Sequence, residues 1–223
     1  MTSRRMGSFA ILAVGLFLSA STAWAHKPIF ADAAARDAEH AVPVRDVDLS
    51  MVAYPPATHQ SPQVWLAFDG KKGKEIEAQL GVPRIARLKE LRPSVAILGP
   101  GLPRWQGAFP IPPGLGGVVI ESAAGTEPKV FYEPFTGTTS WLFEKHKLTL
   151  PEQGRYYLVG YLPNGVQGKF WLAFGSRDAY GLADWLRLPG WIVRVRRFHE
   201  VGGMPVWTWV MGAVGVAAAT VAW

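Results

Sequence analysis

Residues 148–174, LTLPEQGRYYLVGYLPNGVQGKFWLAF, decide the fold of this chain. The apolar runs at 155–162 and 169–174 have the length and the aromatic and branched content of β-strands. Asn164-Gly165 stands between these runs and is a hairpin signal, because both residues tolerate the left-handed backbone of tight turns. We therefore predict two adjacent antiparallel strands joined at Asn164-Gly165.

The same alternation of short apolar runs and turn residues extends through most of the chain. Clusters such as Pro55-Pro56 and Gly99-Pro100-Gly101 supply turn geometries that other residues resist. One short helix is expected at 83–91, where Pro83 suits a first helical position. The pattern predicts a mainly β fold, an antiparallel β-sandwich at 44–178 that follows an extended arm at 26–43. The further predicted strands are 48–54, 63–68, 75–80, 94–98, 117–121, 129–132 and 140–150.

Three stretches of the β region carry a resemblance to a known family. They are W-L-A-F followed by E-I-E-A-Q-L within 63–80, P-E-Q-G-R-Y-Y at 151–157, and G-K-F-W-L-A at 168–173. Together they resemble exported jelly-roll domains of the pre-peptidase C-terminal type, over residues 60–175. The resemblance implies a jelly-roll-like, non-catalytic binding or stabilising module in which the 151–157 element starts a core hairpin. The segment 98–113 departs from the family pattern, and the acidic calcium-binding loops of some members are not evident.

The whole chain also resembles bacterial membrane-anchored exported proteins. The residues that carry this second resemblance are Gly-Pro-Gly-Leu-Pro at 99–103 and Tyr-Glu-Pro-Phe-Thr-Gly-Thr at 132–138. This likeness implies no activity.

Residues 1–25 have the pattern of a secretory signal peptide. Arg4 and Arg5 form a basic start, 8–20 is apolar, and Ala23-Trp24-Ala25 is an A-x-A cleavage site. Cleavage after Ala25 would make His26 the first residue of the mature chain. An uncleaved anchor helix is the alternative, and either reading places the following domain on the exported side of a membrane.

The segment 201–223 contains no charged residue and predicts a transmembrane helix. At about 1.5 Å per residue it would reach about 34 Å, and a bilayer core is about 30 Å thick. Gly212, Gly215, Ala218 and Ala219 would form a small-residue surface suited to packing against a helix of another membrane-protein subunit. A buried hairpin, or a tail removed in maturation, is the alternative.

Residues 179–200 connect the predicted sandwich to this tail. Apolar residues recur at helical spacing on both sides of Pro189-Gly190, which predicts a broken amphipathic helix on the membrane surface. A helix packed under the sandwich is the alternative. Arg194, Arg196 and Arg197 stand beside the apolar residues, and we expect them to contact anionic lipid headgroups or an acidic partner.

Composition excludes several classes of function. The net charge is +6 and falls to +4 without the two arginines of residues 1–25, and basic runs interleaved with aromatics are missing, so nucleic acid is not an expected partner. The chain has no cysteine, which excludes thiolate catalysis, iron–sulfur clusters and Cys-ligated zinc. It also lacks the Gly-x-Ser-x-Gly, His-Glu-x-x-His and Walker motifs of common hydrolases.

Two places carry candidate binding residues. If cleavage follows Ala25, the α-amine and imidazole of His26 could together chelate Cu(II), and His40, His59 or His146 would supply a second imidazole. The sequence does not identify which. The second place is the stretch 132–138, where Tyr132, Glu133 and Phe135 are candidates for a ligand or partner surface; a structural turn is the alternative.

These features predict an exported, membrane-anchored, non-enzymatic β-sandwich that acts as an interaction, accessory or structural subunit at the outer face of a membrane. Its expected partners are membrane lipids and other membrane-protein subunits. A periplasmic copper-binding protein using His26 is the first alternative, with copper as its cofactor. A membrane-bound enzyme is the second.

Overall fold

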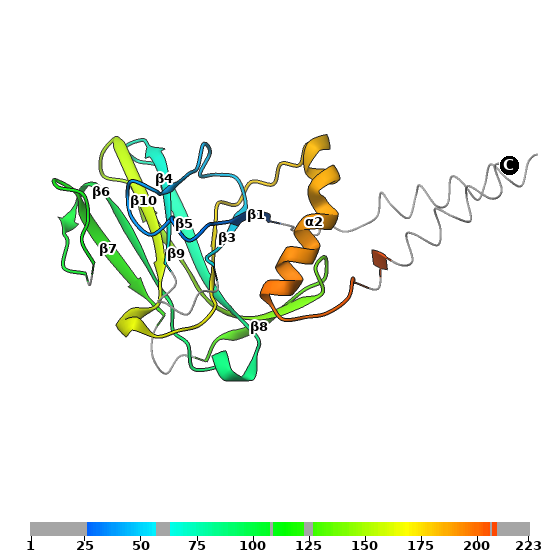
Figure 1. Cartoon of the computed structure of the whole chain (residues 1–223). Helices are drawn as coiled ribbons and strands as arrows, with labels where there is room; N and C mark the ends of the chain where they lie inside the picture. Colours follow the sequence, from blue (N-terminus) through cyan, green and yellow to red (C-terminus); the bar gives the residue numbers. More distant parts are fainter. Residues whose placement is uncertain (1–25, 57–62, 108, 123–126, 206, 209–223) are drawn as a thin grey trace, which may run out of the picture.

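The computed structural model describes residues 26–56, 63–107, 109–122, 127–205 and 207–208 (Figure 1). The predicted signal peptide at 1–25 lies outside the described residues, and so does most of the predicted transmembrane segment at 201–223. Within the described ranges, no helix is both long enough and apolar enough to cross a bilayer.

Two β-sheets pack face to face and form the sandwich (Figure 1). One sheet has six strands in the order β1-β3-β11-β5-β9-β8, and the other has five in the order β2-β4-β10-β6-β7. The strands are β1 Lys27–Phe30, β2 Val42–Pro43, β3 Met51–Tyr54, β4 Gln63–Gly70, β5 Glu75–Pro83, β6 Ser94–Arg104, β7 Gly116–Glu121, β8 Lys129–Glu133, β9 Thr138–Thr149, β10 Gly154–Tyr161 and β11 Trp171–Phe174. The mainly β fold predicted from the sequence is confirmed, and a short 3-10 helix at Ala86–Leu88 lies within the predicted helical stretch.

The arm at 26–43 contributes two strands that the sequence pattern does not reveal. β1 pairs in parallel with β3, and β2 pairs in parallel with β4. Parallel partners are never joined by a tight turn, so neither pairing leaves a hairpin signal in the sequence. The arm is therefore part of both sheets, and it places His26 at the outer edge of the six-stranded sheet.

The hairpin predicted at Asn164-Gly165 is wrong. β10 pairs with β4 and β6 in the five-stranded sheet, whereas β11 pairs with β3 and β5 in the six-stranded one. Gly165 does adopt a left-handed backbone, with a φ of 68°, inside the 3-10 turn Pro163–Gly165. The turn signal is thus correct, but a turn specifies only a local change of direction. Here the chain crosses from one sheet to the other, and Phe170 is fully buried on the way.

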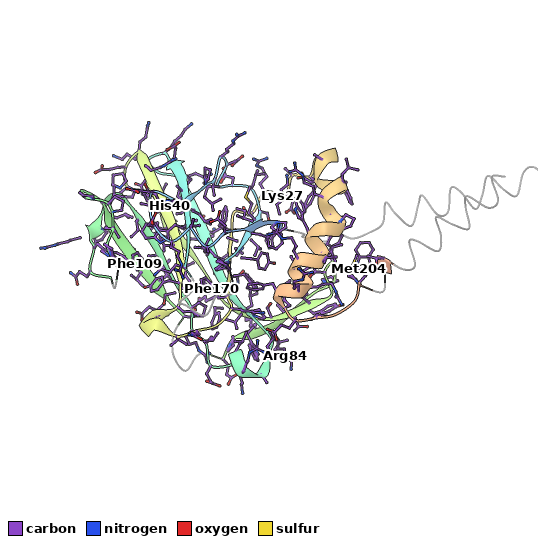
Figure 2. All side chains as sticks on the ribbon, in the orientation of Figure 1. Lys27, His40, Arg84, Phe109, Phe170 and Met204 are labelled. Carbon is purple, nitrogen blue, oxygen red and sulfur yellow. The ribbon has the colours of Figure 1, made fainter. Side chains whose placement is uncertain are left out.

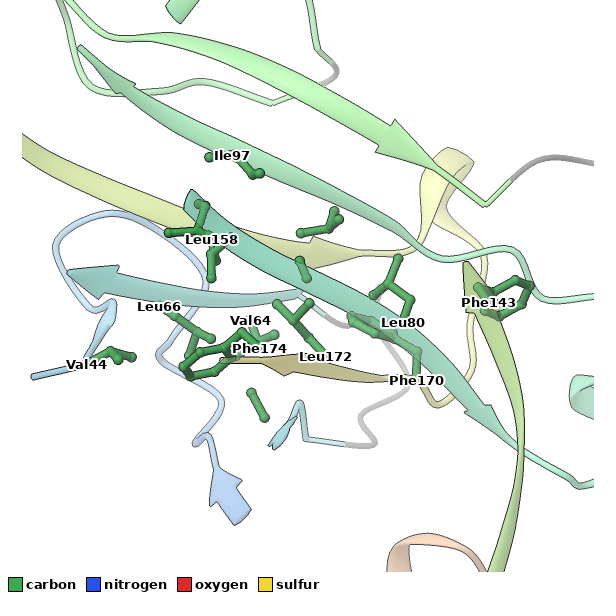
Figure 3. Packing of buried hydrophobic residues seen from close by; sticks show 14 of the residues in the cluster. Val44, Val64, Leu66, Leu80, Ile97, Phe143, Leu158, Phe170, Leu172 and Phe174 are labelled. Atoms are coloured by element: carbon green, nitrogen blue, oxygen red, sulfur yellow. The ribbon is translucent and has the colours of Figure 1, made fainter. Parts of the chain in front are cut away.

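The main core fills the space between the two sheets (Figure 3). Tyr156 is fully buried in it and stacks on Phe68, with ring centroids 5.8 Å apart. Its hydroxyl lies 2.9 Å from the carbonyl oxygens of both Pro100 and Glu152. A Cβ atom at Gly99 would stand 2.1 Å from the tyrosine ring, so the close approach of β6 to this ring requires glycine.

The outer face of each sheet is also covered. Trp65, Leu98 and Val159 of the five-stranded sheet pack beneath Trp105 and Phe109, which follow β6. The Trp105 indole fixes this segment by donating a 2.7 Å hydrogen bond to the Phe109 carbonyl. The segment 98–113, which departs from the jelly-roll pattern, therefore includes a cover for this sheet.

Helix α2, Leu182–Phe198, covers the outer face of the six-stranded sheet (Figure 1). The break predicted at Pro189-Gly190 does not occur, because Pro189 lies inside one continuous helix. An internal proline costs about 3 kcal/mol, and burial of the neighbouring apolar residues offsets it. Leu188, Ile192 and Val195 are buried toward the sheet, while Pro189 and Gly190 face outward.

Candidate functional site

A cavity of about 320 Å³ lies between α2 and the outer face of the six-stranded sheet. Its walls come from strands β1, β3, β5, β8, β9 and β11, from the turn at 133–138, from the segment 175–180 and from α2. Cavities of about 300–1,000 Å³ with mostly apolar walls are typical of small-molecule sites. The aromatic residues that line this one are Tyr54, Phe131, Phe135, Trp171, Phe174, Tyr180 and Trp191.

His26 lies in the wall of this cavity, directly before β1. Its Nδ1 hydrogen-bonds with the hydroxyl of buried Ser50, and no described residue hydrogen-bonds its Nε2. Burial lowers the pKa of His26, against a smaller opposing effect of Asp178 and Glu133. The imidazole is therefore mostly neutral at pH 7.

His199 follows the last residue of α2 and lines the same cavity, with 5% of its surface exposed. Its Nδ1 donates to the Val195 carbonyl at 2.9 Å, so in the neutral ring Nε2 is an acceptor. Ser140 donates to this Nε2 at 3.1 Å and accepts a 3.1 Å bond from the Trp171 indole. Burial lowers the pKa of His199 to about 4. The three side chains form a satisfied network that connects α2 with β9 and β11.

The acidic side chains at the cavity already have partners. Glu77 on β5 forms a 3.1 Å ion pair with Lys145 on β9. Glu133 accepts hydrogen bonds from the backbone N–H groups of Phe135 and Thr136 and from the Thr136 hydroxyl. Among the described lining residues, both carboxylates are thus committed to the protein itself.

The stretch 132–138, predicted as a ligand or partner surface, contains a hydrogen-bonded turn in which Tyr132 and Pro134 are exposed. The Glu133 carboxylate stabilises the turn, and the ring of Phe135 packs 5.1 Å from that of Trp207. The Phe135 carbonyl also accepts a 2.9 Å hydrogen bond from the Trp207 indole. Tyr132 is 59% exposed on β8, an edge strand whose Val130 and Phe131 are exposed as well.

The three arginines predicted to contact lipid or an acidic partner point in different directions. Arg196 is buried and donates to the carbonyls of Thr136 at 2.6 Å and Gly203 at 2.7 Å, with further bonds to Gly137 and Gly202. Its guanidinium joins the 133–138 turn to the segment after α2 and is not available to a membrane. Arg194 and Arg197 are exposed on α2, and Arg194 lies 3.8 Å above the ring of Phe30.

Of the histidines predicted as second copper ligands, the two that the structure describes lie away from His26. His40 pairs with Asp37 at 2.8 Å, on the side of the sandwich away from α2 (Figure 2). His146 lies opposite Ala78 in the β5–β9 register, and Ala78 belongs to the core between the sheets. His59 lies outside the described residues. In the part of the chain that the structure describes, no group of three histidines or acids is placed to hold a metal ion.

His199 is the site histidine that the sequence reasoning missed. It continues the spacing of Leu188, Ile192 and Val195, which marks the buried face of α2. That periodicity is the signal that could have identified it.

No protein-family model matches this chain, and no curated protein sequence matches it. Among solved structures, the chain is similar to CorA, described as a surface-associated copper-binding protein important in copper acquisition by Methylomicrobium album BG8. The TM-score is 0.32 and the identity 12%, over 69% of this chain and 99% of that one. Similarity at this level supports no conclusion about function. The resemblance to pre-peptidase C-terminal-type domains stays a prediction, since none of these comparisons concerns that family.

Proposed function

We propose that this protein is an exported, membrane-anchored accessory subunit that binds partners rather than catalysing a reaction. In this proposal α2 lies on the outer surface of a membrane, and the uncharged segment at 201–223 anchors the chain in it. The observation that carries the proposal is the outward face of α2, where Trp185, Leu186 and Val193 are 60%, 79% and 42% exposed.

The exposed apolar residues form a stripe, since Leu186, Pro189 and Val193 recur at helical spacing on the side away from the sheet. Arg187, Arg194 and Arg197 are exposed beside this stripe. An apolar stripe flanked by arginines suits the headgroup region of an anionic bilayer, where each basic residue contributes about 1 kcal/mol.

The course of the chain after α2 supports the same orientation. Glu200 accepts hydrogen bonds from Arg87 and Lys169, and Arg196 holds the carbonyls of Gly202 and Gly203. The uncharged segment therefore leaves the sandwich at a fixed point beside the end of α2. A helix that starts there would enter the membrane next to the surface on which α2 lies.

The absence of cysteine makes a direct test simple, because one introduced cysteine can be labelled alone. The full chain carrying Leu186→Cys is labelled with a nitrobenzoxadiazole dye in vesicles of anionic lipid. We expect a blue-shifted emission that lipids with shallow spin labels quench. Val166→Cys, exposed in the β10–β11 connection, is the control and should behave as in water. Equal emission and quenching at the two positions would show that α2 does not lie on the membrane.

A copper-binding role is the second candidate, favoured by the position of His26 in the cavity wall with a neutral imidazole. Once residues 1–25 are removed, the α-amine and imidazole of His26 would form one chelating pair, while His40 and His146 lie elsewhere. Mass spectrometry of the mature N-terminus and Cu(II) titration of the protein and its His26→Ala variant test this role. Retention of Ala25, or equal binding by protein and variant, would exclude it.

A further inference from the structure

We propose that the cavity beneath α2 binds a small, uncharged, mostly aromatic molecule that carries one hydroxyl group, such as a phenol. His26 supplies the polar contact, and the aromatic walls supply the rest of the binding surface. This proposal concerns the inner face of α2, whereas the proposed membrane contact concerns the outer face. Either proposal can therefore be refuted without affecting the other.

The shape and the walls of the cavity point to an apolar occupant. Protein interiors rarely keep voids larger than a water molecule, so a preformed space of about 320 Å³ has the character of a site. Trp171 and Tyr54 contribute from the sheet, and Trp191 contributes from α2. Aromatic rings prefer offset or edge-to-face contact with other rings, which favours an aromatic ligand over an aliphatic one.

The electrostatics of the walls favour an uncharged occupant. Glu77 is paired with Lys145, and Glu133 is satisfied by its own turn. Burial also raises the pKa of Tyr54 and Tyr180, so both phenols are neutral at pH 7. A charged ligand would lose its hydration without meeting an uncommitted counter-charge among these groups.

One ring nitrogen defines the polar end of the site. The network of His199, Ser140 and Trp171 is complete without a ligand, because each of its donors already has an acceptor. His26 differs, since Ser50 hydrogen-bonds its Nδ1 while no described residue hydrogen-bonds its Nε2. A ligand hydroxyl can donate to this nitrogen or accept from it, so it fits either tautomer of His26.

The test compares three probes of one shape on the full chain in a non-ionic detergent. The probes are 2-naphthol, naphthalene and 2-naphthoate, and binding is followed by quenching of tryptophan fluorescence and by calorimetry. We expect saturable binding of 2-naphthol about tenfold tighter than that of naphthalene, as one added hydrogen bond gives. Naphthoate should bind most weakly. Naphthoate binding as tight as that of 2-naphthol, or no saturable binding of either neutral probe, would overturn the proposal.

Variants distinguish the cavity from unspecific uptake by detergent. His26→Leu should remove the tenfold preference for 2-naphthol, while the matched change His40→Leu, on the exposed arm, should leave it intact. Ala173→Leu fills the floor of the cavity and should weaken both neutral probes by at least tenfold. Val195→Phe fills the same space from α2 and serves if Ala173→Leu does not fold. Unchanged binding in a folded cavity-filling variant would place the probes elsewhere and refute the assignment.

Discussion

Acid should destabilise this protein through His199, and the structure gives the size of the effect. Burial lowers the pKa of His199 from its ordinary 6.5 to about 4 in the folded chain, so the unfolded chain binds the proton more readily. The stability that depends on the neutral ring is complete above pH 6.5, falls progressively as the pH drops from 6.5 to 4, and is fully lost below pH 4. The shift corresponds to about 3 kcal/mol in full, of which about 2 kcal/mol is lost between pH 7 and pH 5.

Urea unfolding of the full chain in non-ionic detergent, followed by tryptophan fluorescence at pH 7 and pH 5, measures this loss. His199→Gln should lower stability at pH 7, because a buried hydrogen-bond network is broken, and should remove most of the dependence on pH. The remaining dependence belongs partly to His26, whose pKa is also lowered. His40→Gln is the control and should lose at least as much as wild type, since His40 is exposed and Asp37 raises the pKa of its imidazole instead of lowering it. If wild type and His199→Gln lose the same free energy between pH 7 and pH 5, the reasoning about His199 is refuted.

Three further changes test how α2 and the strands beneath it are held. Hydrogen bonds from Arg87 and a neighbouring lysine lower the pKa of Glu200 to about 2. Wild type therefore has stability above pH 4.5 that it loses as the pH falls toward 2. Glu200→Gln should remove this stability, which is about 1 kcal/mol because the groups are partly exposed. Arg196→Met should cost about 3 kcal/mol, because buried carbonyls lose their charged donor, and should speed amide exchange in the 133–138 turn. Unchanged exchange would contradict the role of Arg196 in joining this turn to the segment after α2. Gly81→Ala should cost about 2 kcal/mol, because the added Cβ would lie 2.0 Å from an indole ring. Gly190→Ala places its Cβ in open space and should stabilise the protein by about 1 kcal/mol. Thermal melts that show the reverse order would contradict the described packing.

Local signals in the sequence predict most of the strands, but not the two in the arm and not how the strands pair. Short apolar runs between turn residues mark strands such as β4 and β10 wherever they pair. β1 is different, because four residues that pair in parallel with β3 carry no turn signal at either end. The sequence predicts the turn at Pro163–Gly165, yet a turn signal does not specify whether the next strand stays in the same sheet.

For the candidate site too, the sequence indicates single residues but not which of them lie together. The position of His26 after the predicted cleavage site makes it a candidate binding residue in the sequence. The cavity around it is formed by strands and a helix that lie far apart in the sequence, so the sequence does not reveal it. The sequence predicts the same contacts for Arg196 and Arg197 because they are neighbours in the chain. Successive helical residues point about 100° apart, so only the packing of α2 reveals that Arg196 faces inward and Arg197 outward. The packing of α2 likewise shows that Pro189 lies on the outward face of the helix, where it does not interrupt the contact with the sheet.

The cavity is bounded by the first and the last described elements of the chain, β1 and α2, and this has a consequence for its assembly. The core between the sheets contains no residue of α2, so the sandwich can close before that helix arrives. Contacts between such distant segments form late in folding, because a long loop must close first. Until then Val52, Trp171 and Ala173 present a bare apolar sheet face to water. The chain should therefore be most prone to aggregate, and most dependent on a holding chaperone, in the interval just before α2 becomes available.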